Sequence, residues 1–234
     1  MIAGGLAIMS GMFAEFGIEQ MTVADGALRE GVLYDLLGRF HHRDMRTASV
    51  AQFMRRYHVD TRQAKRVAVL AGQLYAQVAP QGQDDTDSQR NFLQWAAQLH
   101  EIGISIAHSG YHKHGAYILE NADMPGFSRK DQVRLAQLVR AKRGGLLKLA
   151  EFQAVTAQTD MRLQVLALRL AVLFHRSRVN TALPSLALTC AGTGYRLALS
   201  ADWLDANPLT CTALKEEVQV WKDTGSKLIV EKQA

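Results

Sequence analysis

Apolar residues recur every three or four positions through most of the first 180 residues, which is the spacing of helices with one buried face. The clearest run lies between Asp60, which can cap the start of a helix, and Pro80, which ends one. The apolar face of that run carries Val67, Leu70, Leu74 and Val78. A polar, acidic stretch at 81–88 then predicts an exposed loop.

Other segments show the same pattern with start and stop signals of their own. Ser128 and Asp131 have the spacing of a capping box, and Gly144-Gly145 can end the helix that they begin. Residues 21–23 are expected to be extended. The predicted helices cover residues 4–16, 25–36, 47–57, 60–79, 89–103, 128–143 and 160–178.

The pattern changes after Pro184. Residues 186–190 and 195–199 have the composition of short strands and flank Ala191-Gly192-Thr193-Gly194, whose turn chemistry predicts a hairpin. A helix at 209–221 and a strand at 228–230 are expected to follow. The sequence therefore predicts a mainly α fold in which a helical body is followed by a small α+β unit.

Composition and charge narrow the class of protein. The 234 residues are 48% hydrophobic and 21% charged, which is ordinary for a globular protein. No apolar run approaches the ~20 residues that span a bilayer, and the two cysteines form no disulfide framework. We therefore expect a cytoplasmic location, with peripheral membrane association left open.

The formal net charge of +5 suits a polyanionic partner such as a phosphate chain, a nucleotide or a nucleic acid. Aromatic residues make up 7% of the chain and do not alternate with basic ones. Since single-stranded nucleic acid is bound on stacking platforms, this composition argues against specific nucleic-acid binding.

Several long motifs stand out, among them Gly4-Gly5-Leu6-Ala7-Ile8, Leu99-His100-Glu101-Ile102-Gly103 and His108-Ser109-Gly110-Tyr111-His112-Lys113-His114. Together with residues 27–39 and 117–127, they resemble the C-terminal portion of the exopolyphosphatase/guanosine-pentaphosphate phosphohydrolase (Ppx/GppA) family. Within that family the long proteobacterial exopolyphosphatases are the nearer branch, and the guanosine-pentaphosphate enzymes are the alternative. The resemblance covers essentially the whole chain.

The resemblance implies three parts: the tail of a second actin-like domain (1–42), a helical HD-like domain (43–180) and a small α+β domain (181–234). It also implies that the active site, with the acidic residues that bind Mg²⁺, lies in preceding domains. This chain would then hold no catalytic residue and no metal ligand. The implied reaction of the whole protein is release of terminal phosphate from linear polyphosphate, and the expected partners are inorganic polyphosphate and a second copy in a homodimer.

An autonomous metal phosphohydrolase is a second hypothesis. Metal-dependent histidine–acid domains need an early His, a later His-Asp pair and a final Asp to hold the cations that activate water. The corresponding positions here hold Gln63, His100-Glu101 and Val172. Valine cannot bind a cation and glutamine is a poor ligand, so too few ligands remain.

Basic residues are the better candidates for a binding site. Residues 128–148 hold seven Lys and Arg against one Asp, and residues 162–178 hold four Arg and no acid. Because each phosphate of a chain carries about one charge, spaced cations can bind the chain without reading a base. The expected groove for a polyanion comprises His100, His108, His112, Lys113, His114, Arg140, Arg143, Arg169 and Arg176.

Two further expectations concern the histidines and the N-terminal helices. Although His108 and His112 are four residues apart, the intervening Ser109-Gly110 favours a loop over one continuous helix. A third hypothesis is a helical scaffold for dimerisation or docking. Exposure of its apolar side chains would favour that scaffold, namely Leu6, Phe13, Leu28 and Leu33.

Overall fold

The computed structural model describes residues 2–20, 45–80, 86–146, 159–180, 182–192 and 194–233. The chain divides into two compact units, Met1–Arg43 and Asp44–Ala234. The three-part division at residues 42 and 180 stays a prediction. Within the described ranges, no helix combines the length and the apolar composition needed to cross a membrane.

In the first unit the described element is α1 (Ile2–Phe16), which confirms the first predicted helix. The side chains of Leu6 and Phe16 are exposed, and that of Phe13 is half-buried. The extended segment expected at 21–23 and the helix expected at 25–36, with Leu28 and Leu33, lie outside the described residues.

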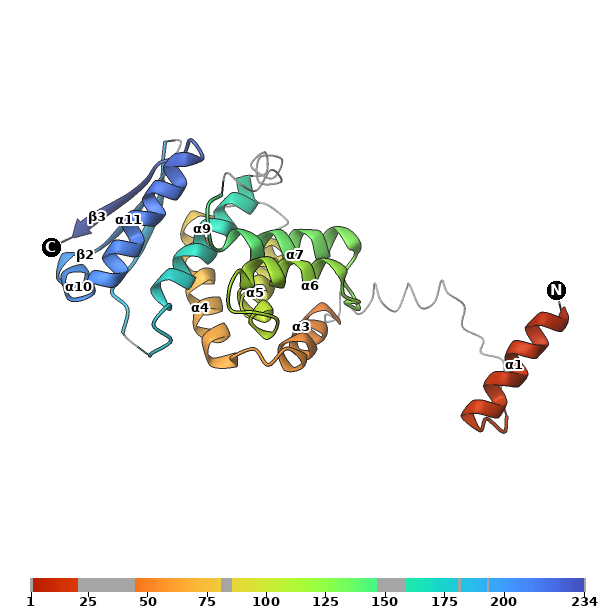
Figure 1. Ribbon diagram of the computed structural model, residues 1–234. Coiled ribbons are helices and arrows are strands. Elements are labelled where there is room, and N and C mark those ends of the chain that lie inside the picture. The colour runs from red at the N-terminus through yellow and green to blue at the C-terminus, as the bar shows by residue number, and fades with distance from the viewer. Residues whose placement is uncertain are drawn as a thin grey trace. The chain divides into compact units, whose positions relative to one another are not determined.

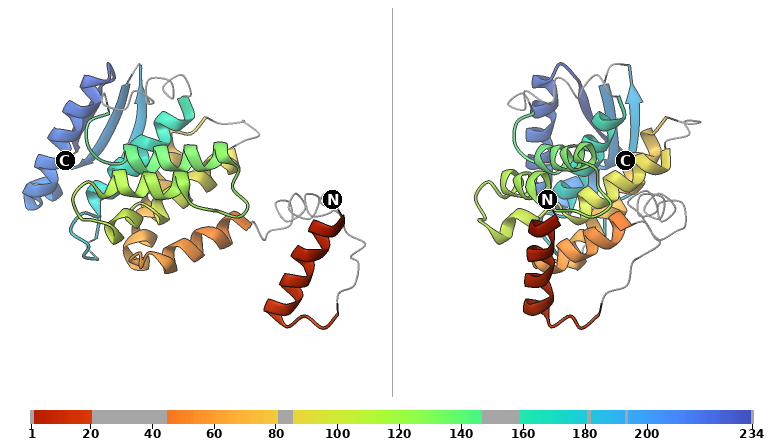
Figure 2. Two further views of the ribbon diagram at one scale, coloured as in Figure 1. Left: turned by 45° about the vertical axis from the view of Figure 1, so that its right-hand side comes forward. Right: turned by 90° about the vertical axis from the view of Figure 1, so that its right-hand side faces the viewer.

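The second unit consists of a helical body followed by a small sheet (Figures 1 and 2). Its helices include α3 (Met45–Arg56), α4 (Thr61–Val78), α5 (Thr86–Gln98), α6 (Tyr111–Asn121), α7 (Arg129–Ala141) and α9 (Thr159–Phe174), with the 3-10 turn η1 (Ile102–Ser105). Helix α4 packs against α5 and α9, and α6 packs against α7. The mainly α fold is thereby confirmed.

Two of the predicted helix starts are made by side-chain caps. The Asp60 carboxylate accepts hydrogen bonds from the backbone N–H groups of Arg62 and Gln63, both at 3.0 Å. Ser128 and Asp131 form the reciprocal capping box, with side-chain to backbone distances of 3.1 and 3.2 Å. Such caps satisfy N–H groups that the first helical turn leaves without a partner.

Leucine side chains from the packed helices fill the interior of the body. The largest fully buried aliphatic side chains include Leu74, Leu93, Leu99, Leu119, Leu135, Leu138 and Leu166. Burial of each such side chain contributes about 1.5–3 kcal/mol relative to exposure. The apolar periodicity read from the sequence is therefore the source of the core.

Helix α6 was not among the predicted helices, and its position depends on a close approach of two backbones. A Cβ atom at Gly103 in η1 would lie 2.0 Å from the carbonyl oxygen of Tyr111 and 2.4 Å from the backbone nitrogen of Gly115. Only glycine permits this approach. The contact places the His100-Glu101 segment beside the start of α6.

The sheet has the order β1 (Ala187–Ala191), β2 (Gly194–Ser200) and β3 (Leu228–Gln233). Strands β1 and β2 are antiparallel, which confirms the predicted hairpin, and β2 and β3 are parallel. The parallel pair requires a crossover, supplied by α10 (Ala201–Ala206), which was not predicted, and α11 (Pro208–Asp223). Trp221 of α11 is fully buried, with its ring centroid 5.4 Å from that of Tyr195.

A buried ion pair joins the helical body to the C-terminal helix. The Arg169 guanidinium donates to both carboxylate oxygens of Glu217, from Nε at 2.6 Å and from Nη2 at 2.8 Å. Its Nη1 donates to the carbonyl oxygens of Ala141 and Gly144, at 2.7 and 3.0 Å. The Trp221 indole N–H donates to the same Glu217 carboxylate, at 2.7 Å. One guanidinium thus connects α9, the end of α7 and α11.

We expect Arg169→Met to lower the free energy of unfolding by about 3–5 kcal/mol, because it leaves the Glu217 carboxylate buried without its cation. Urea denaturation followed by circular dichroism measures the change. The double variant Arg169→Met/Glu217→Leu removes both charges and should recover most of the loss. A double variant as unstable as the single one would show that the unpaired charge is not the cause.

Candidate functional site

Two adjoining hollows open where α6, the end of α7 and α9 meet. They share Tyr111, Arg143, Val172 and Arg176, and we call the two together the basic trough. The first hollow, of about 640 Å³, is also lined by Gln63, Glu101, Ile104, His108, Ser109, Gly110, His112 and Arg178. The second, of about 390 Å³, is also lined by Lys142, Gly144, Gly145, Arg169, Leu173, Ala213, Glu216, Glu217 and Val220.

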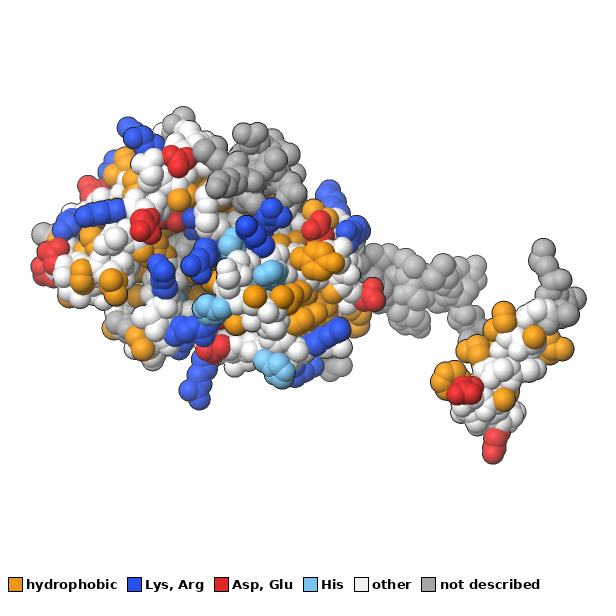
Figure 3. Space-filling view, in the orientation of Figure 1, with side chains coloured by type: hydrophobic (Ala, Val, Ile, Leu, Met, Phe, Trp, Pro, Cys, Tyr) orange, Lys and Arg blue, Asp and Glu red, His pale blue; other side chains and the backbone are white. Residues whose placement is uncertain are grey.

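Two exposed arginines give the trough its accessible positive charge. Arg143 and Arg176 line both hollows, and no hydrogen bond or ion pair with another described residue engages either guanidinium. The Arg143 guanidinium lies 5.4 Å from the centroid of the Tyr111 ring. Figure 3 shows Lys, Arg and His side chains gathered on this face of the molecule. Guanidinium groups of this kind bind phosphate oxygens through paired, charge-assisted hydrogen bonds.

Two of the predicted histidines also line the trough. His108 precedes α6 and its ring stacks near that of Tyr111, with centroids 6.1 Å apart, whereas His112 lies in the first turn of the helix. The expectation that they do not share a continuous helix is therefore confirmed. Burial, followed by the charges of Lys142 and Lys113, lowers the pKa of His112 to about 4. The His112 imidazole is thus neutral near pH 7.

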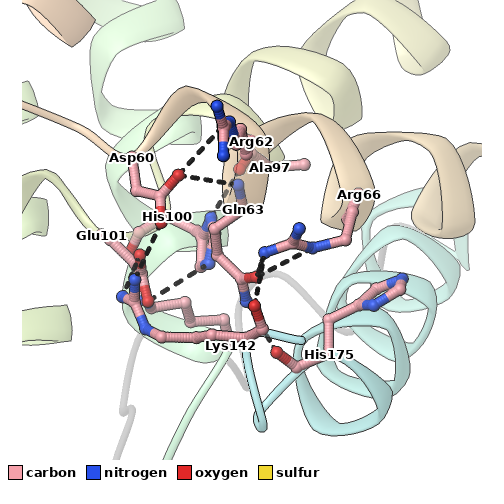
Figure 4. A network of polar contacts seen from close by, with 10 residues as sticks. Asp60, Arg62, Gln63, Arg66, Ala97, His100, Glu101, Lys142 and His175 are labelled. Atoms are coloured by element: carbon pink, nitrogen blue, oxygen red, sulfur yellow. Dashed lines mark hydrogen bonds and ion pairs between the residues drawn. The ribbon is translucent and has the colours of Figure 1, made fainter. Parts of the chain in front are cut away.

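The three positions compared with a metal-binding domain converge on the first hollow, since Gln63, Glu101 and Val172 all line it. Their side chains have other partners, however. The Gln63 amide donates to the His175 carbonyl oxygen at 2.8 Å (Figure 4). Glu101 forms an ion pair with Arg178. In the part of the chain that the structure describes, no group of three or more His, Cys, Asp or Glu residues could hold a metal ion. These residues do not fit a divalent cation.

His100 is buried and does not line the first hollow, since only 1% of its surface is exposed. Its Nδ1 is 2.6 Å from the Ala97 carbonyl oxygen, which can only accept, so Nδ1 carries the proton. Burial lowers the pKa of His100 to about 3. The expected contact with a polyanion does not fit His100, which is buried, nor does it fit Arg169, whose guanidinium donates to Glu217 and to the carbonyl oxygens of Ala141 and Gly144.

Lys142 lies close to His100 and is also buried, with 3% of its surface exposed. Its ammonium donates to the His100 carbonyl oxygen and lies 4.0 Å from the centroid of the Tyr111 ring. Burial lowers the pKa of Lys142 well below its usual value. Lys142 therefore contributes to the packing of the trough floor more than to its charge.

The remaining predicted site residues lie outside both hollows. Lys113 is exposed on α6, His114 is half-buried beside it, and Arg140 is half-buried in the last turn of α7. Arg178 lines the first hollow but was not among the predicted binding residues. Its place in a cluster of four arginines was visible in the sequence, whereas no sequence signal pairs Arg169 with Glu217, 48 residues later.

Comparison with known proteins gives the family of the chain. Residues 45–218 match Ppx/GppA phosphatase, domain III, and residues 1–40 match the Ppx/GppA phosphatase family. A guanosine-5'-triphosphate,3'-diphosphate pyrophosphatase of Pseudoalteromonas translucida is 38% identical over 97% of this chain and 46% of its own length. Proteins of the same name from Vibrio vulnificus and Vibrio cholerae are 34% and 35% identical, again over 97% of this chain and 46% of their own.

The chain thus spans about half the length of the curated relatives that it matches. The domain III match covers most of the helical body, including the trough-lining segments of α4, α6, α7 and α9. On these matches, the chain belongs to the Ppx/GppA phosphatase family.

Proposed function

We propose that this chain holds a phosphate-rich substrate of a Ppx/GppA phosphohydrolase while other segments of the protein carry out the hydrolysis. The observation that supports the proposal is the pair of exposed arginines, Arg143 and Arg176, that lines both hollows of the basic trough. Since the described trough residues do not fit a divalent cation, we assign Mg²⁺ and the water-activating acids to the preceding domains.

Linear polyphosphate is the substrate that we propose first. A trough with arginines shared between two hollows suits a repeating phosphate chain, because such a chain presents equivalent charges along its length. The second candidate is guanosine-5'-triphosphate,3'-diphosphate, which the names of the relatives favour. We also propose that the protein forms a homodimer and is located in the cytoplasm.

Charge reversal in the trough tests the first candidate. Arg143→Glu/Arg176→Glu should weaken binding of long polyphosphate by about tenfold or more and flatten its dependence on salt, by ~0.7 in log–log slope for each lost phosphate contact. Titration calorimetry at low and high salt measures both quantities. The matched control, Arg55→Glu/Lys65→Glu, makes the same charge change at exposed positions that do not line the trough.

An equal loss of affinity in the trough variant and in the control variant would mean that polyphosphate binding depends only on the net charge of the chain. Such a result would contradict a binding site in the trough.

The two substrates can be separated with the unmodified chain. We expect long polyphosphate to bind more tightly than guanosine-5'-triphosphate,3'-diphosphate, because only a long chain can contact both hollows at once. We also expect no release of orthophosphate from either compound with added Mg²⁺. Competition binding and a phosphate-release assay measure these outcomes. Tighter binding of the guanosine compound would favour the second candidate. Release of orthophosphate by this chain would contradict the proposal that other segments of the protein carry out the hydrolysis.

The neutral state of His112 predicts a pH dependence of binding. A bound polyanion opposes the nearby cations and raises the pKa of His112 from its value of about 4, so binding takes up a proton. Affinity should therefore rise as the pH falls below the pKa that His112 has in the complex, by up to about tenfold per pH unit, because one proton is taken up on binding. In the variant His112→Asn the polyphosphate still titrates but the imidazole is absent. The difference between the two pH profiles is therefore the contribution of His112. An unchanged pH profile in this variant would contradict a contact with His112.

A further inference from the structure

Arg178 lines the first hollow together with Arg143 and Arg176, so three guanidinium groups face this space of about 640 Å³. Among the described residues, Arg178 differs from the other two because it has ion-pair partners. Its Nη1 lies 3.2 Å from Oδ2 of Asp60, and its Nη2 lies 2.5 Å from Oε2 of Glu101. The charge of Arg178 is therefore shared between two carboxylates before any ligand binds.

The two ion pairs leave the Arg178 guanidinium with further capacity to donate. An arginine side chain has five N–H groups, and each of these ion pairs joins one nitrogen to one carboxylate oxygen. The side chains of Arg178 and Asp60 are each 42% exposed, so a ligand in the hollow can reach this pair. An ion pair that is so exposed contributes little, because water solvates both charges. A phosphate can therefore replace Asp60 as the partner of Nη1 at little cost.

The backbone fixes the base of the Arg178 side chain. Its φ of 60° lies in the left-handed region, which is uncommon for residues other than glycine. The N–H of Arg178 donates to the His175 carbonyl oxygen at 3.1 Å, and Nη2 of Arg66 donates to the Arg178 carbonyl oxygen at 3.0 Å. Because the backbone is held in this way, rotation about side-chain bonds is enough for the guanidinium to change partner.

Asp60 has a second role that keeps its carboxylate charged and in place. Its Oδ1 accepts hydrogen bonds from the backbone N–H groups of Arg62 and Gln63, both at 3.0 Å, while Oδ2 pairs with Arg178. The hydrogen bond from Gln63, above all, lowers the pKa of Asp60. The Asp60 carboxylate is thus ionised near pH 7, where it competes with a phosphate for the guanidinium.

We propose that Arg178 is a third phosphate-binding arginine of the basic trough, and that Asp60 weakens this contact by competing with phosphate for the guanidinium. The inference rests on the proposed function, since it adds a contact to the same site. A guanidinium binds phosphate in the same paired geometry as carboxylate, so one can replace the other. Glu101, with 10% of its side chain exposed, keeps its pair with Nη2 and positions the guanidinium.

The variant Asp60→Asn tests this competition without removing the helix cap. Asparagine retains Oδ1 and is as good an N-cap residue as aspartate. Its NH₂ group replaces Oδ2 and can only donate, so it cannot pair with Nη1. We expect long polyphosphate to bind this variant about threefold or more tightly, with a salt slope steeper by up to ~0.7, because one more phosphate contact forms. Titration calorimetry at low and high salt measures both quantities.

Two comparisons show whether the gain comes from Arg178. The matched control, Asp205→Asn, makes the same charge change and releases Lys232, 2.9 Å away, from an ion pair outside the trough. It should change the affinity by less than about twofold, because salt screens distant charges. Arg178→Gly keeps the left-handed backbone without strain and should weaken binding. The double variant Asp60→Asn/Arg178→Gly should then show no gain over Arg178→Gly.

The decisive comparison is the effect of Asp60→Asn with and without the Arg178 side chain. An equal gain in both backgrounds would overturn the inference, because Asp60 would then act only through its own charge. A gain in Asp205→Asn as large as that in Asp60→Asn would overturn it as well. Arg178→Gln, which keeps a side chain at this position, should repeat the result of Arg178→Gly. Failure of the proposed function is a separate result, namely unchanged polyphosphate binding in Arg143→Glu/Arg176→Glu.

Discussion

The buried pair of Arg169 and Glu217 is the interaction on which the rest of the architecture depends. Removing one partner would leave a charge in the protein interior, where solvation by water cannot compensate for it. The pair fixes the C-terminal helix on the body, and its guanidinium also holds the carbonyl groups at the end of α7. Because Arg143 follows directly after that helix end, the position of an exposed trough arginine depends on this buried contact.

Arginines of one short stretch of the chain have three different physical roles. Arg169 is buried and structural, Arg178 neutralises two acids, and Arg176 is exposed without a described partner. Charge counted along the sequence therefore overstates the charge available to a ligand. The positive charge available to a polyanion is the charge of those side chains that are not paired within the protein. In the described trough these are Arg143 and Arg176.

The chemistry of the trough suits an anion more than a cation, at the positions that we compared with a metal-binding domain. The positions Gln63, Glu101 and Val172 still converge, yet an amide, an acid paired with Arg178 and an aliphatic side chain occupy them. A phosphate chain is repelled by free carboxylates and attracted by guanidinium groups. Pairing the acids internally therefore serves the proposed binding function.

The sequence by itself determined the elements whose signals are local. The Asp60 cap, the Ser128–Asp131 capping box and the hairpin turn all act within a few residues, so they could be identified before the structure. The long motifs also indicated the family. Helix α6 was missed because its glycine and histidines weaken the local signal, while packing against η1 and α7 stabilises it.

Only the tertiary structure decided which candidate residues face the trough. His100 and Arg169 have side chains typical of a phosphate-binding site, yet burial and hydrogen bonding give both a structural role. The partners of Arg169 and Arg178 come from segments far away in the chain, and no periodicity or spacing encodes such pairs. Burial and electrostatic pairing are properties of distances in space, and these distances are fixed only when the helices pack.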